Sequence, residues 1–178
     1  MSVAAGLLLA FATVLFMEGF AYAMHRWVMH GFLWSLHRSH HEPHDNVLEK
    51  NDWFGVMFTA PAILLIALGT QMGAWVGLAW IGLGISLYGL IYFVFHDLMV
   101  HQRMPNRYVP KSGYMKRIVQ AHKLHHAASS KHGTVSFGFL WAPPIRELKA
   151  ALARNQAELR KPRGDDPGTV PGSESETA

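Results

Sequence analysis

Three long apolar stretches constrain the fold of this chain more than any other feature of its sequence. They cover roughly residues 3–24, 53–71 and 74–95. Each is long enough to cross a bilayer, which takes about 20 apolar residues in a helix. Because only a short turn separates the last two stretches, they are expected to form a tight helical hairpin. The sequence therefore predicts an all-α fold, a polytopic membrane helical bundle.

The basic residues are sorted along the chain in a way that predicts its orientation. All 16 Lys and Arg residues lie in segments 26–50 or 103–163, and none lies in the first stretch or in the hairpin. Positive segments stay in the cytoplasm, so the N-terminus and the hairpin tip are expected on the opposite side. A cleaved signal peptide is a competing interpretation of the first stretch, because Ala21-Tyr22-Ala23 resembles a cleavage site. The lack of a basic start, the length of the run and Glu18 within it argue against cleavage.

Residues 1–161 are expected to form a single membrane-embedded domain. After Pro143-Pro144 the spacing of leucines predicts an amphipathic helix over residues 145–159, lying on the membrane surface or on the domain. A fourth membrane-embedded segment is considered around residues 134–142. Residues 162–178 are polar, acidic and rich in Pro and Gly, which is typical of a disordered tail.

Ten of the twelve histidines form four clusters in the repeated order H-x4-H, H-x2-HH. On a helix, positions i, i+3 and i+4 share a face about 100° wide, so each H-x2-HH is expected to present three imidazoles toward one point. The two rings of an H-x4-H pair diverge by about 140° on an ideal helix. They either reach two different metals or meet where the helix loosens. The ten residues are His25, His30, His37, His40, His41, His96, His101, His122, His125 and His126.

Ten imidazoles exceed what one ion can bind, so the sequence predicts two metal ions held by a histidine-rich helical cap on the cytoplasmic side. Imidazole suits Zn, Fe, Cu or Ni and does not choose among them. Glu18 and Asp97 are expected to orient ligand histidines by accepting their second ring N–H. His44 and His132 lie outside the clusters and are interpreted as non-ligands.

Other classes of protein fit the pattern less well. A haem carrier would place paired histidines at mid-depth in the spans, and the absence of cysteine excludes thiolate haem and iron–sulfur clusters. A zinc protease would need H-E-x-x-H, whereas His41-Glu42 is followed by Pro43-His44. The excess of Lys and Arg over Asp and Glu is explained by membrane topology, so no nucleic-acid partner is expected.

Tyr88 and Tyr92 are interpreted as packing residues of the third span, with the lining of a substrate tunnel as the alternative.

Several runs in the sequence resemble one known family. These are MHRWVMHG, HRSHHEPH, YFVFHDLMVHQR, YVPKSGYMKR, HKLHHA and VSFGFLWAPP. In this order they resemble the fatty acid hydroxylase superfamily of histidine-rich membrane di-iron enzymes and, within it, the bacterial β-carotene hydroxylases. The resemblance covers about residues 10–150. All ten clustered histidines stand where this family has its candidate metal ligands.

The resemblance implies a non-haem di-iron monooxygenase of the inner membrane that uses O2 to hydroxylate carbon 3 of β-ionone rings. β-Carotene taken from the bilayer lipid would become β-cryptoxanthin and then zeaxanthin, and canthaxanthin would become astaxanthin. The chain has no dinucleotide-binding G-x-G-x-x-G motif, so its electrons are expected from another protein, for which the resemblance suggests ferredoxin and its reductase. The basic residues after position 102 are interpreted as topological or as a docking surface for such a donor. Two alternatives stay open, a sterol or fatty acyl hydroxylase or desaturase of the same superfamily and a non-catalytic carotenoid- or metal-binding membrane protein.

Overall fold

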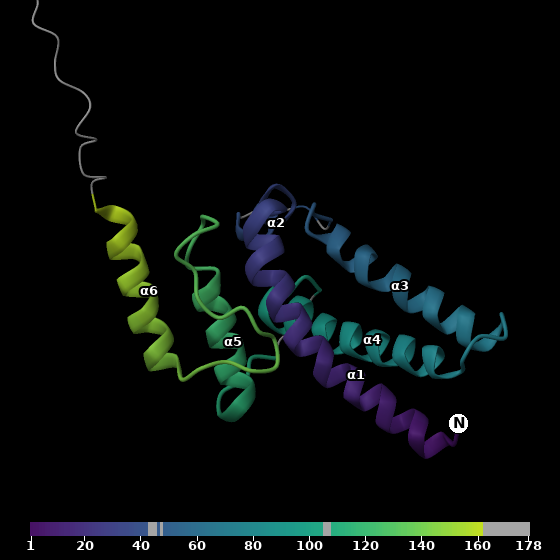
Figure 1. Ribbon diagram of the computed structural model, residues 1–178. Coiled ribbons are helices and arrows are strands. Elements are labelled where there is room, and N and C mark those ends of the chain that lie inside the picture. The colour runs from purple at the N-terminus through teal and green to yellow at the C-terminus, as the bar shows by residue number, and fades with distance from the viewer. Residues whose placement is uncertain (43–45, 47, 105–107, 162–178) are drawn as a thin grey trace, which may run out of the picture.

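A computed structural model describes residues 1–42, 46, 48–104 and 108–161, and within these every regular element is helical (Figure 1). The all-α prediction is confirmed. The predicted tail, 162–178, and His44 lie outside the described residues. The elements are α1 (Val3–Ala23), the π-helix η1 (Met24–Phe32), α2 (Trp34–His41), α3 (Asp52–Thr70), α4 (Gly77–Tyr92), the π-helix η2 (Phe93–Val100), α5 (Gly113–His125) and α6 (Ile145–Arg160).

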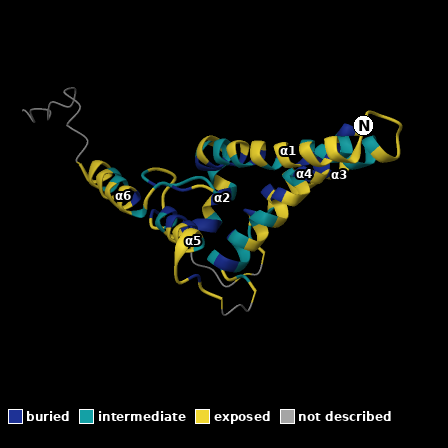
Figure 2. Cartoon of the chain, turned by 90° about the horizontal axis from the view of Figure 1, so that it is seen from below, coloured by how far each residue is buried: buried dark blue, intermediate teal, exposed yellow. Residues whose placement is uncertain are grey.

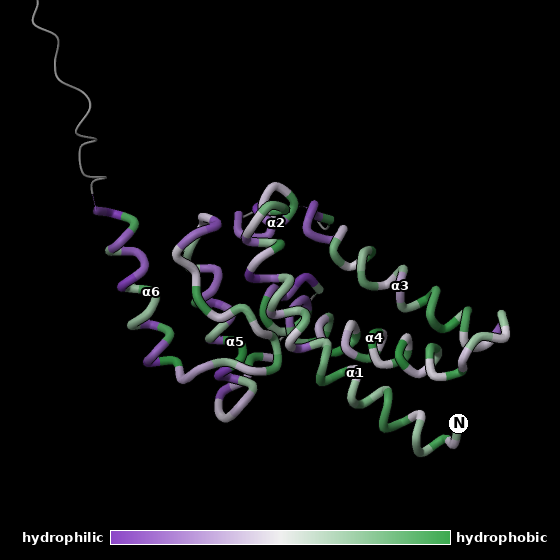
Figure 3. Tube along the Cα trace, viewed as in Figure 1, coloured by the Kyte–Doolittle hydropathy of each residue, from purple (hydrophilic) through white to green (hydrophobic). Residues whose placement is uncertain are grey.

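Three of the helical segments are long and apolar enough to cross a membrane. They are Val3–Phe32, Asp52–Thr70 and Gly77–Val100, which match the three predicted spans. These helices consist mainly of hydrophobic residues (Figure 3), and many of their residues are exposed (Figure 2), among them Leu8 at 70 % and Phe16 at 67 %. An apolar surface of this extent is unfavourable in water, and the chain is an integral membrane protein.

Glycines allow α4 to pack closely against both α1 and α3. A Cβ atom on Gly84 would lie 2.7 Å from the carbonyl oxygen of Ala10 in α1. A Cβ atom on Gly82 would lie 2.7 Å from the carbonyl oxygen of Ala62 in α3. Small residues of this kind let helix backbones approach each other within a bilayer, where the packing of side chains replaces the hydrophobic effect as the driving force.

The N-terminus and the α3–α4 turn lie at one end of the bundle, and η1, η2, α2 and α5 lie toward the other (Figure 1). The end with α2 and α5 carries the polar part of the chain (Figure 3). Helix α6 begins at Ile145, as predicted, and buries Leu148 and Leu152 against α5, whereas Leu159 is 56 % exposed. Residues 134–142 form no helix but a loop between α5 and α6 that passes beside the histidines.

Candidate metal centre

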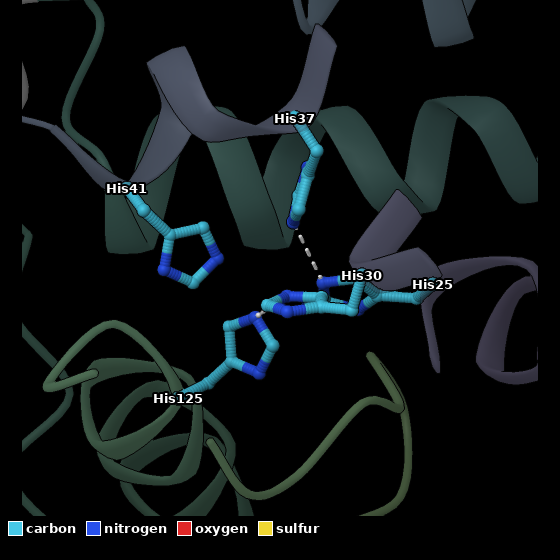
Figure 4. A group of neighbouring side chains, drawn as sticks. All are labelled: His25, His30, His37, His41 and His125. Carbon is cyan, nitrogen blue, oxygen red and sulfur yellow. Dashed lines mark hydrogen bonds between the residues drawn. The ribbon is translucent and has the colours of Figure 1, made fainter. Parts of the chain in front are cut away.

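The ten clustered histidines converge on two neighbouring groups of five. In each group one ring nitrogen of every residue lies within 4.8 Å of the corresponding nitrogens of the other four. The groups touch, since the rings of His41 and His126 stack with their centroids 4.4 Å apart. Group 1 consists of His25, His30, His37, His41 and His125, drawn in Figure 4, and group 2 consists of His40, His96, His101, His122 and His126.

The two π-helices bring each H-x4-H pair together. A π-helix closes its hydrogen bonds between residues five apart, so positions i and i+5 come to one side of the helix. In η2 the backbone N–H of His101 donates to the carbonyl of His96 at 2.9 Å, which spans this pair. His25 and His30 are likewise placed in one group by η1. Of the two arrangements that the spacing allowed, the structure shows the one in which the helix loosens.

Each H-x2-HH triplet is divided between the groups, and the expectation that its three rings point to one centre is wrong. At 3.6 residues per turn, positions i and i+4 differ by about 40°, whereas i+3 lies about 100° from i+4. His37 and His41 therefore join one group, and His40, which lies between them in the sequence but points about 100° away from His41, reaches the other. In the second triplet His125 crosses to group 1 in the same way.

The outward-facing ring nitrogens are held by oxygen acceptors. In group 1 the Nδ1 atoms of His25 and His125 donate to the carbonyls of Phe137 and Val135 at 2.9 and 3.0 Å. In group 2 the Nδ1 atom of His96 donates to a carboxylate oxygen of Asp97 at 2.7 Å. An Nδ1 that donates leaves a lone pair on Nε2, so these contacts set the rings to bind inward through Nε2.

The inward nitrogens have the spacing of a metal coordination shell. Nε2 of His30 lies 3.1 Å from Nε2 of His125, and both rings donate through Nδ1 to backbone carbonyls. Neither nitrogen then carries a proton, and two facing lone pairs repel each other unless a cation lies between them. Two nitrogens that bind one ion at about 2.1 Å and at right angles lie about 3.0 Å apart. Among the described residues, Nε2 of His41 is buried with no hydrogen-bond partner. In group 2 the Nε2 atoms of His40 and His96 lie 2.9 Å apart while both Nδ1 atoms donate to carboxylates, so the donor set fits a metal ion in each group.

Burial also keeps the histidines in the protonation state that metals need. Loss of hydration lowers the pKa of His37 to about 3 and the pKa of His41 to about 4. Burial likewise lowers the pKa of His125, and the neighbouring His25 and His122 lower it further. These rings are therefore neutral near pH 7, which is the form that binds a cation.

Glu18 contacts a loop and a tyrosine rather than a histidine ring. One carboxylate oxygen accepts hydrogen bonds from the backbone amides of residues 139–141 at 2.9–3.1 Å. The other accepts the Tyr88 hydroxyl at 2.8 Å. The same loop presents the carbonyl of Phe137 to His25, so Glu18 acts on His25 through the loop and not through the direct contact expected from the sequence.

An apolar cavity of about 460 Å³ lies between α1, α3 and α4 beside the histidines. Tyr88, Tyr92 and Phe139 are among the residues that line it, and the Tyr92 hydroxyl lies 3.4 Å from Nε2 of His96. Leu90 and Phe93 also line it and are 59 % and 40 % exposed, so the cavity is open at the surface of the spans. The tyrosines assigned to packing thus also form the wall of an apolar site.

The sequence pattern did not identify two polar residues that belong to the site. Asn51 accepts the Nδ1–H of His37 at 2.7 Å, and Glu49 accepts that of His40 at 2.9 Å. Both lie in the short link before α3, several residues after the nearest histidine cluster. In the sequence they are marked only as polar residues directly before a span. Such residues are common in membrane proteins, so this position is weak evidence for a role in the site.

Comparison with known proteins gives consistent matches over most of the chain. The sequence profile described as fatty acid hydroxylase matches residues 10–143. The chain is 53 % identical to the beta-carotene hydroxylase of Paracoccus sp. (strain PC1) over 149 residues, which cover 83 % of this chain and 91 % of that protein. It is 52 % identical to the beta-carotene hydroxylase of Pantoea ananas over 145 residues, 82 % of each protein. It is 39 % identical to the chloroplastic beta-carotene 3-hydroxylase of Haematococcus lacustris over 145 residues, 79 % of this chain and 44 % of that protein. No solved structure matches the chain significantly.

Proposed function

The chain belongs to the fatty acid hydroxylase family, and we propose that it is a β-carotene 3-hydroxylase whose two histidine groups each bind one iron ion. The observation that carries the proposal is the position of an apolar cavity, open among the membrane spans, whose wall residues Tyr92 and Phe139 contact rings of the two histidine groups. The names of the similar bacterial proteins supply the substrate.

The residues of groups 1 and 2 would hold the two ions through their inward Nε2 atoms. Bound iron supplies the activation of O2 that the oxidation of an unactivated C–H bond requires. The protein contributes the ligand set, the orientation of each ring by its Nδ1 acceptor, and a site that bulk water reaches poorly. His25, His37 and His125 are at most 1 % exposed, which protects the centre from side reactions with solvent.

The cavity would receive one ring end of the carotenoid from the bilayer. Its walls are apolar, as the substrate requires, and its exposed residues lie on the lipid-facing spans. Phe139 stands between this cavity and both groups, with its ring centroid 5.5 Å from that of His25 and 5.6 Å from that of His96. We infer that Phe139 and Tyr92 set how closely a substrate ring approaches the metals.

The electrons would come from a separate protein. The chain has no cysteine to bind an iron–sulfur cluster and no G-x-G-x-x-G motif for a dinucleotide, which supports an external donor. Exposed Lys116, Arg117 and Lys123 lie on α5, the helix that carries His122 and His125. Their charge suits an acidic donor such as a ferredoxin, which its reductase would reduce. The segregation of basic residues supports a location in the inner membrane with this end in the cytoplasm.

The proposal is tested by expression in a host that accumulates β-carotene, with iron and a ferredoxin system present. We expect β-cryptoxanthin and zeaxanthin, with two irons per chain in the detergent-purified protein. Replacement of His125 by alanine should abolish the products and reduce the iron content. Pigment binding without O2 consumption would instead indicate a non-catalytic binding protein, and hydroxylated sterols or acyl chains would indicate a different substrate. One zinc ion per chain with full activity would overturn the di-iron assignment.

A further inference from the structure

The two histidine groups differ in the charge of the atoms behind them. In group 1 every Nδ1 atom donates to an uncharged oxygen, at distances of 2.7–3.2 Å. These acceptors are the backbone carbonyls of Phe137, Lys131, Ala128 and Val135 and the side-chain amide of Asn51. In group 2, by contrast, His40 donates to Glu49 at 2.9 Å and His96 donates to Asp97 at 2.7 Å. At least two ligands of group 2 are therefore backed by carboxylates.

The carboxylates behind group 2 belong to a sheltered cluster of acidic side chains around Arg103. Arg103 makes a bidentate contact with Asp52 at 2.7 and 2.9 Å, and it lies 3.7 Å from Glu49 and 3.8 Å from Asp97. In these contacts three carboxylates share one guanidinium. The side chains of Glu49 and Asp97 are only 4 % and 14 % exposed, so solvent screens their charge weakly.

Charge behind a ligand changes how strongly the ligand holds a cation. An imidazole that donates to a carboxylate becomes a more basic ligand through its other nitrogen, and loss of such a partner typically weakens metal binding roughly 10–100-fold. In the part of the chain that the structure describes, no group 1 histidine has such a partner, and all five are buried. An ion entering group 1 loses its hydration with no carboxylate in direct contact with its ligands among the described residues, which is costly in a poorly polarisable environment.

We propose that the two groups are unequal metal sites, in which Glu49 and Asp97 make group 2 the tighter site, filled first and emptied last. The inference rests on the proposed function only in that both groups bind metal. It adds that Glu49 and Asp97 are positioning residues, and that tight metal binding by group 2 requires their negative charge as well as their acceptor oxygens.

The test is an equilibrium titration of the full-length, detergent-purified, metal-free protein with Zn²⁺ in the presence of a competing chelator. The wild type should bind two ions in two steps, with affinities at least roughly 10-fold apart. Glu49→Gln keeps the acceptor oxygen and removes the charge, so it should weaken the tight step roughly 10–100-fold and leave the weak step unchanged. Asp97→Asn should act in the same way. Asn51→Asp, which adds a charge behind His37 in group 1, should tighten the weak step.

Glu42→Gln is the matched control, because it removes the same charge next to His41 from an exposed carboxylate that pairs with Arg38. Both steps should stay as in the wild type. Two equal steps in the wild type, or a Glu49→Gln protein that binds like the wild type while Glu49→Ala does not, would overturn the inference. A wild type that binds no metal would overturn the proposed function instead. If a group 2 variant does not fold, Asn51→Asp tests the inference through group 1 alone: a tighter weak step supports it, and an unchanged weak step overturns it.

Discussion

Glu18 should hold the loop of residues 134–142 against the histidines, and its replacement by alanine should loosen that loop while leaving every histidine in the chain. Its carboxylate accepts four hydrogen bonds, three from backbone amides of residues 139–141 and one from Tyr88. Near an apolar span these donors have few other partners, so an unpaired amide or hydroxyl there is costly. The loop carbonyl of Phe137 that holds His25 should then lose its fixed position.

The size of the effect follows from the contacts. A hydrogen bond to a charged group contributes about 1.5–3 kcal/mol. The four bonds share one carboxylate and are not additive, and the amide of the exposed Trp141 can bond to water. We therefore expect Glu18→Ala to cost about 3–5 kcal/mol, which corresponds to a fall in Tm of about 6–20 °C for a chain of this size. Glu18→Gln keeps an acceptor oxygen and should cost about 1–2 kcal/mol, as should Tyr88→Phe, which removes one bond.

The assay is thermal unfolding of the detergent-purified protein, with bound metal and hydroxylated carotenoid measured on the same samples. Glu18→Ala should lower the Tm and the product formed per bound metal, and Glu18→Gln should restore most of both. Glu42→Ala is the control, since its exposed ion pair with Arg38 is expected to contribute less than about 1 kcal/mol. A Glu18→Ala protein that melts and hydroxylates like the wild type would refute the role of the loop.

Four further predictions test the site and the bundle. His40→Ala should remove one ion of the two, because only group 2 uses that ring, whereas His132→Ala should leave the metal count unchanged; elemental analysis decides. Gly84→Ala should destabilise the protein by about 1–3 kcal/mol, because the added methyl would lie 2.6 Å from a side-chain carbon of α1. Gly19→Ala, with nothing within 4 Å, should melt no lower than the wild type. Gly89→Leu should block the cavity and lower hydroxylation at unchanged metal content, and full activity would show that substrate binds elsewhere. Chelation of the metals should lower the Tm, and the Tm should recover in proportion to the logarithm of added free metal.

The spans could be predicted because their physical requirement is simple. A bilayer needs about 20 apolar residues, and the chain meets this need three times without interruption by basic residues. The ends of two spans were placed too early, at 24 and 95, because hydropathy falls where the histidines begin although the helix continues. That these extensions are π-helices could not be predicted, since an H-x4-H spacing fits either an α-helix with diverging rings or a π-helix with converging ones.

The ten converging histidines could be predicted as a set, but not their division. The division depends on a rotation of about 100° between adjacent residues of one helix, which matters only when a second centre lies within reach. His40 and His125 reach that second centre because α2 and α5 meet at the site, where the ring centroids of His41 and His125 lie 4.9 Å apart. Glu49, Asn51 and the loop carbonyls were missed for a related reason: they are local acceptors whose importance comes from the tertiary fold, and backbone carbonyls leave no trace in a sequence.

The crossing of these two histidines has a consequence for how the site forms. Residues 1–42 supply four ligands of group 1 and one of group 2, and residues 93–126 supply four of group 2 and one of group 1. Neither half can therefore complete a five-histidine group alone, and an ion in either group ties both halves together. Because ions that bind the folded form stabilise it by mass action, filling either group also stabilises the alignment of α2 with α5 on which the other depends. The two sites are thus expected to differ in strength, through the carboxylates behind group 2, and yet to assemble as one unit.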